Sequence, residues 1–121
     1  MKMLCLITIF FALCVSSIAE SNKTNGPDCS GHWPTIMTFV HMKNAAILTN
    51  QDIDSTKTKT DRLASQKIGK DLWRQVYDIT FTKKSGETIE AIAVHDASTE
   101  ECSMSGVEVF VVSKHLNPDR K

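Results

Sequence analysis

The stretch Leu72-Trp73-Arg74-Gln75-Val76-Tyr77-Asp78-Ile79-Thr80-Phe81-Thr82 decides the fold of this chain. Large apolar side chains recur at every second position, at Trp73, Tyr77, Ile79 and Phe81. Polar residues occupy the alternate positions, at Arg74, Asp78, Thr80 and Thr82. A period of two predicts a β-strand with one buried and one solvated face. We therefore expect Trp73 and Tyr77 to face the core of the sheet, although aromatic residues also serve as contact points in protein interfaces.

Three more strands are expected around residues 72–82. Residues 83–86 end in Gly86 and predict a hairpin loop, which leads to a third strand over 88–95. The loop 96–106 carries Cys102, and a Val-rich last strand covers 107–115. Residues 57–63 alternate Lys and Thr, a pattern typical of an exposed edge strand.

One helix precedes the strands. Pro34 suits the first turn of a helix, where the missing N–H costs nothing. Apolar residues then recur at helical spacing on one face, with Phe39 beside them: Trp33, Ile36, Met37, Val40 and Ile47. We expect a helix over 34–48. The order predicts an α+β domain in which this helix packs on a curved four-stranded antiparallel sheet.

The start of the chain has the three parts of a secretory signal peptide. Lys2 precedes an apolar run of about 13 residues, and Ser17 and Ala19 form a small-x-small cleavage site. The alternative is an uncleaved anchor, but a membrane span needs about 20 apolar residues. We expect a signal peptide over 1–19, a flexible leader over 20–28, a single domain over 29–116 and a polar tail over 117–121, in a periplasmic or secreted protein.

Two of the four cysteines, Cys29 and Cys102, remain after signal cleavage. An even pair in an exported protein predicts one disulfide, and two free buried thiols are the alternative. Such a bridge closes a loop of roughly 70 residues, for which chain entropy gives about 4 kcal/mol of stability.

Charge and motifs exclude several classes of function. The formal net charge is zero, so the chain lacks the basic balance of a nucleic-acid binder. The four histidines show no metal-binding spacing, and we expect no cofactor and no membrane contact after cleavage. His95 stands beside Asp96, but neighbours on a strand point to opposite faces.

Carboxylates concentrate near Cys102. Asp96, Glu100 and Glu101 lie in the loop, and Glu87 and Glu90 lie on the hairpin before it. An acidic rim would steer a basic protein partner. We therefore expect these five residues to form a partner-binding site, with an ordinary solvated loop as the alternative.

The element order resembles that of the cystatins, in which a helix packs across an antiparallel sheet. Inhibitory cystatins carry a Gln-x-Val-x-Gly hairpin, to which Gln66-Lys67-Ile68-Gly69-Lys70 is the nearest stretch, with the glycine one place early. The Pro-Trp pair of their second hairpin is absent. Residues 29–34 and 100–107 also resemble small exported enterobacterial proteins of the immunity type, which bind antibacterial toxins.

We therefore expect a periplasmic immunity or inhibitor protein that neutralises a toxin or hydrolase by occluding it, without enzymatic activity of its own. A cystatin-like protease inhibitor is one alternative. Another is a small secreted nuclease, with His95 and His115 as acid and base and Lys114 or Lys70 as the cation. The last alternative is a structural domain of the cell envelope.

Overall fold

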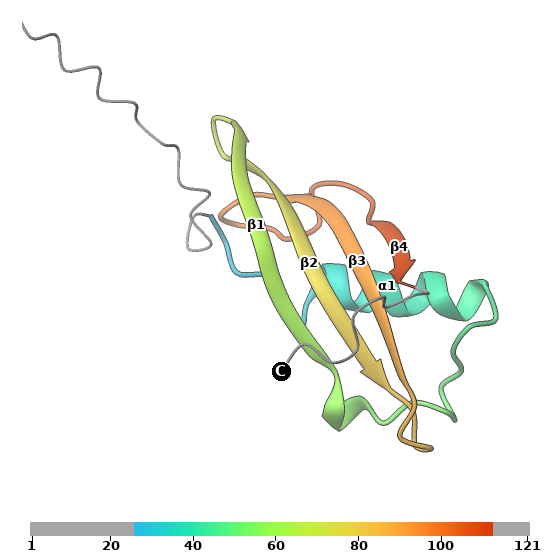
Figure 1. Ribbon diagram of the computed structural model, residues 1–121. Coiled ribbons are helices and arrows are strands. Elements are labelled where there is room, and N and C mark those ends of the chain that lie inside the picture. The colour runs from blue at the N-terminus through green and yellow to red at the C-terminus, as the bar shows by residue number, and fades with distance from the viewer. Residues whose placement is uncertain (1–25, 113–121) are drawn as a thin grey trace, which may run out of the picture.

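Four antiparallel strands and one helix make up residues 26–112, the part of the chain that the computed structural model describes (Figure 1). The order is α1 (Trp33–Asn44), a 3₁₀ turn η1 (Ser55–Lys57), β1 (Lys59–Gly69), β2 (Leu72–Thr82), β3 (Thr88–Ala97) and β4 (Glu108–Val112). The strands lie side by side as β1-β2-β3-β4, each antiparallel to its neighbour. With α1 across one face, the predicted α+β architecture is confirmed.

The alternation of β2 builds the core, as predicted. Tyr77 and Ile79 are fully buried, and Phe81 packs its ring 5.8 Å from that of Phe39 on α1. Trp73 shares this face and is partly buried, with Gly26 packed against its ring. A Cβ on Gly26 would lie 2.7 Å from the indole, so only glycine permits this approach.

The third strand presents small residues to the helix. Ala91, Ala93 and Ala97 are fully buried on the face that α1 covers, while Met42 of α1 and Leu48 beyond it fill the space above. Small side chains on β3 let the helix approach closely, and a close-packed core requires such matched volumes.

The helix ends earlier than predicted. It stops at Asn44, and Ala46 adopts a left-handed conformation with φ 58°. The N–H of Ile47 then donates to the carbonyl of Met42 over 2.9 Å, which closes the helix end. This turn carries Leu48 back into the core. Leu48 is therefore apolar because it is buried beyond the end of the helix, and not because it belongs to the apolar face of the helix.

The first strand is longer than predicted, at Lys59–Gly69 in place of residues 57–63, although it is the expected edge strand. Its pairing with β2 shifts register between Arg62 and Ala64 and again between Lys67 and Gly69. Each shift is an irregularity that breaks the period of two, so the alternation of this strand is hidden in the sequence.

The predicted leader over 20–28 overlaps the described residues only at 26–28. Pro27 is held against the sheet, because its carbonyl accepts hydrogen bonds from Arg62 and Gln75, each over 2.7 Å. The ordered domain therefore includes residues 26–28. The signal peptide over 1–19, the tail over 117–121, Lys114 and His115 lie outside the described residues. In the described part, no helix has the length and apolar character needed to cross a membrane.

The predicted disulfide between Cys29 and Cys102 is confirmed, with a Cα–Cα distance of 5.8 Å. It joins the segment before α1 to the loop between β3 and β4, across 73 positions of the chain. It therefore ties one end of the helix layer to one end of the sheet.

Replacing both cysteines, as Cys29→Ala with Cys102→Ala, should lower the free energy of unfolding by about 4 kcal/mol, because the unfolded chain regains the entropy of a long open loop. Urea denaturation of the oxidised wild type and the double variant measures this difference. Reduced wild type should behave like the variant. A loss below about 1 kcal/mol would contradict the structural role of the bridge.

Candidate functional site

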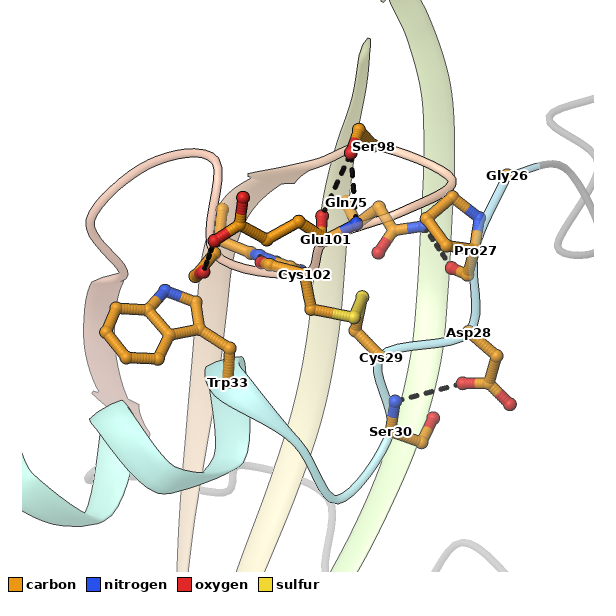
Figure 2. Close-up of a disulfide and its surroundings, with 12 residues drawn as sticks. Gly26, Pro27, Asp28, Cys29, Ser30, Trp33, Gln75, Ser98, Glu101 and Cys102 are labelled. Carbon is orange, nitrogen blue, oxygen red and sulfur yellow. Dashed lines mark hydrogen bonds between the residues drawn. A yellow bond between two sulfur atoms is a disulfide. The ribbon is translucent and has the colours of Figure 1, made fainter. Parts of the chain in front are cut away.

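The loop 98–106 between β3 and β4 is fastened to the rest of the domain by the disulfide and by hydrogen bonds (Figure 2). Ser98 organises its first turn: its N–H donates to the carbonyl of Glu101 over 2.8 Å. Its hydroxyl accepts from the N–H groups of Glu101 and Glu100, over 3.0 and 3.3 Å. Ser98 thus supplies hydrogen-bond partners for the backbone of the turn that carries both glutamates.

The second half of the loop is fixed to β3 and α1. The N–H of Met104 donates to the carbonyl of Asp96 over 3.1 Å, and the N–H of Asp96 donates to the Ser105 hydroxyl over 2.8 Å. The indole N–H of Trp33 donates to the carbonyl of Ser105 over 3.0 Å. With the disulfide at Cys102, these bonds hold the loop from three sides.

The turn between β1 and β2 joins this loop through Asp71. Its carboxylate accepts from the Thr99 N–H over 3.1 Å and from the Thr99 hydroxyl over 2.9 Å. Asp71, Glu100 and Glu101 are all exposed, and none forms a salt bridge within residues 26–112. We call these three residues the acidic end.

The structure does not bring the five predicted carboxylates together. Glu100 and Glu101 share the acidic end, but Glu87 lies in the β2–β3 turn at the opposite end, 3.4 Å from Lys83. The ten residues of β3 separate these ends by roughly 30 Å. Glu90 lies on β3, on the sheet face turned away from α1.

Asp96 is close to the loop, but an arginine already binds it. The Arg74 Nε and Nη2 atoms donate to its two carboxylate oxygens over 3.0 and 3.2 Å. Its side chain is 17% exposed. A carboxylate held in this bidentate pair contributes little free charge, so Asp71 replaces Asp96 in the site. Asp71 escaped the sequence analysis because only the folded chain places it beside Thr99.

His95 lies in the core and not in a reactive cleft. It is 2% exposed, its Nδ1 donates to the carbonyl of Cys102 over 2.9 Å, and its ring lies 5.5 Å from that of Tyr77. Its Nε2 is buried with no hydrogen-bond partner, and burial lowers its pKa. Asp96 points to the opposite face of β3, as predicted, so the two do not form a catalytic pair. Among residues 26–112, no cluster of potential ligands could hold a metal ion.

A buried polar network lies beneath the loop. The Tyr77 hydroxyl accepts from the Cys29 N–H over 2.9 Å and donates to the Gln75 carbonyl oxygen over 2.8 Å. The Gln75 amide nitrogen then donates to Ser65 over 3.1 Å and to Pro27 over 2.7 Å. Burial raises the pKa of Tyr77, which keeps the phenol protonated and able to donate. This network positions the N-terminal partner of the disulfide.

A groove of about 420 Å³ opens between α1 and β1, and its walls carry no charged side chain. Ile36, Phe39, Val40, Ile53 and Phe81 supply its apolar surface. It offers no group for acid–base chemistry, so the acidic end remains the better candidate for recognition of a partner.

Comparison of the chain with protein-family models, with curated proteins and with solved structures finds no match. The resemblance to cystatins therefore rests on the order of the elements and the layer arrangement alone.

The buried imidazole predicts a loss of stability in mild acid. The unfolded His95 binds a proton as the pH falls through about 6.5, whereas the buried ring, with its lowered pKa, resists protonation. The free energy of unfolding should therefore decrease below about pH 6.5, and His95→Asn should remove this part of the slope. Urea denaturation between pH 5 and 8 measures it.

The control is His41→Gln, because His41 is exposed on α1. This variant should keep the wild-type slope. An unchanged slope in His95→Asn would show that another group causes the acid sensitivity.

Proposed function

We propose that this chain is an exported binding protein of the immunity or inhibitor type, which neutralises a basic toxin or hydrolase by covering its surface with the acidic end. The proposal rests on one observation: Glu100 and Glu101 are exposed, form no salt bridge within residues 26–112, and are carried on a loop fixed by the disulfide and its hydrogen bonds. The protein acts in the periplasm or outside the cell and needs no cofactor.

The fixed loop favours recognition over a structural role. A loop that is already ordered loses less conformational entropy on binding, so more of the interaction energy appears as affinity. The disulfide supports an oxidising compartment, where such bonds form and persist.

The charges favour a basic partner. Lys70 lies beside Asp71 in the chain, but Glu100 and Glu101 form no salt bridge within residues 26–112. Exposed carboxylates raise the rate of encounter with a positive surface, and they gain most when the partner supplies Lys or Arg. An enzyme that acts on an anionic substrate presents cations at its active site, and a rigid acidic loop is complementary to such a site. Inhibition would then follow from occlusion.

A second candidate is a cystatin-like protease inhibitor. It is supported by the contact between Asp71 and Thr99, which places the β1–β2 turn and the loop 98–106 at the same edge of the domain, next to Gly26. These are the positions of the two hairpins that carry the diagnostic residues of inhibitory cystatins. An assay with papain separates the candidates: the second requires inhibition at micromolar protein, and the first expects none.

Charge reversal at the acidic end should slow the binding of the partner. The mature protein, immobilised, captures its partner from the cells that produce it, and the identified partner is then purified. We expect Glu100→Lys with Glu101→Lys to lower the association rate at least tenfold at low ionic strength, because steering is lost. Surface plasmon resonance measures the rate, and residual activity of the partner measures inhibition.

Asp52→Lys with Glu87→Lys is the matched control. It changes the net charge equally, but Asp52 and Glu87 lie at the opposite end of the sheet, where the Asp52 carbonyl accepts from the Lys84 N–H. This variant should associate at close to the wild-type rate. Equal losses in both variants would assign the effect to net charge and refute the acidic end as the interface.

A further inference from the structure

The face of the sheet turned away from α1 carries a group of apolar side chains. Residues paired directly across antiparallel strands share a face, so the register places Val76 opposite Val94 and Ile92 opposite Phe110, while Val112 lies opposite Glu90. Phe110 is 54% exposed and Val112 is 40% exposed. In Figure 1, α1 covers only the other side of these strands. We call this surface the open face.

Three carboxylates stand beside these apolar side chains. Asp61 of β1 lies directly opposite Asp78 of β2, and Glu90 of β3 lies opposite Thr80, two positions along from Asp78. Like charges directly opposite each other on a sheet are destabilising. Lys59 of β1 lies opposite Thr80 on the same face, but within residues 26–112 no salt bridge joins it to any of the three.

Asp78 is the least satisfied of the three. Its Oδ1 atom is buried and has no hydrogen-bond partner. Burial raises the pKa of Asp78, and the charges of Glu90 and Asp61 raise it further. A cation placed over the three carboxylates would offset their mutual repulsion.

We propose that the open face is a second interaction surface, which binds an extended protein segment whose cationic and apolar side chains stand at every second position and so point to one side. Charge complementarity carries the choice of partner: the carboxylates Asp61, Asp78 and Glu90 require cations, and Phe110 requires an apolar contact. This surface is distinct from the acidic end, so the inference does not depend on the function proposed above.

The same charges exclude two other occupants. A second copy of the chain would bring like carboxylates face to face, which is unfavourable. An anionic surface such as a phospholipid membrane would be repelled.

The spacing suits an extended segment. Neighbouring strands lie about 4.8 Å apart, so Phe110 on β4 is about 10 Å from Asp78 on β2. Alternate side chains on one face of an extended segment recur about every 7 Å. A lysine over Asp78 and an apolar residue one or two steps further therefore reach both parts of the open face.

The test uses an acetylated, amidated peptide of three Lys-Ser-Val-Ser repeats, in which Lys and Val share one face of the extended chain. It is titrated into the ¹⁵N-labelled mature protein and followed by NMR. We expect amide shifts at β2, β3 and β4 around Asp78 and Phe110. Asp78→Asn and Phe110→Thr should each weaken binding at least fivefold, because each removes one half of the recognition. Asp52→Asn, which neutralises an exposed carboxylate elsewhere, should bind as the wild type does.

Two further comparisons make the result decisive. A peptide of three Lys-Ser-Thr-Ser repeats should bind at least fivefold more weakly, and Glu100→Lys with Glu101→Lys should leave the affinity for the Lys-Ser-Val-Ser peptide within about twofold of wild type. Equal binding of both peptides, shifts confined to the loop 98–106, or no binding at millimolar peptide would each overturn the proposal. None of these results bears on the toxin or hydrolase partner of the acidic end.

Discussion

The attachment of Cys29 to the sheet is the constraint on which the rest of the domain depends. This residue is fully buried and is held twice, by the covalent bond to Cys102 and by the hydrogen bond from its N–H to the Tyr77 hydroxyl. The first bond fixes the loop 98–106, and the second fixes the point four residues ahead of α1. Because Ala91, Ala93 and Ala97 of β3 offer the helix only small side chains, van der Waals contact with them leaves its position weakly determined. The bridge and the phenol therefore set where the helix begins and where the acidic end stands.

The buried polar groups beneath Cys29 are tolerated because their hydrogen bonds offset the free-energy cost of removing them from water. Gln75 is fully buried between Tyr77, Ser65 and Pro27, and each of its side-chain atoms has a partner. An unpaired amide in that position would cost about 1–3 kcal/mol. The two orphaned side-chain atoms within residues 26–112 are elsewhere: His95 Nε2 on the helix side of β3 and Asp78 Oδ1 on the open face. The first is an imidazole kept neutral by the core. The second is a carboxylate among like charges, and this difference makes only the second a candidate for recognition.

Local patterns predicted the elements whose residues face one environment along their whole length. The period of two in β2, the glycine of the hairpin at Gly86 (φ 92°) and the cysteine pair are signals of this kind. The pattern failed where the backbone is irregular, at the register shifts of β1 and at the left-handed Ala46. The sequence pattern also did not identify all the residues of the acidic end, because the neighbours that a carboxylate meets in the fold decide whether its charge is paired. Asp96 is neutralised by Arg74 on the next strand, and Asp71 joins Thr99 across 28 positions of the chain.

Segregation of charge explains how a chain with zero formal net charge can still present acidic surfaces. Lys83 and Lys84 lie at the β2–β3 turn, whereas Lys70 lies beside Asp71 in the β1–β2 turn. Glu100 and Glu101 lie at the acidic end, and Asp61, Asp78 and Glu90 lie on the open face. Exposed charges are screened over about 8 Å at physiological ionic strength. Because the β2–β3 turn is roughly 30 Å from the acidic end, its lysines do not offset the field there. Composition averages over this separation, so a neutral total excludes a basic nucleic-acid binder but says nothing against an acidic interface.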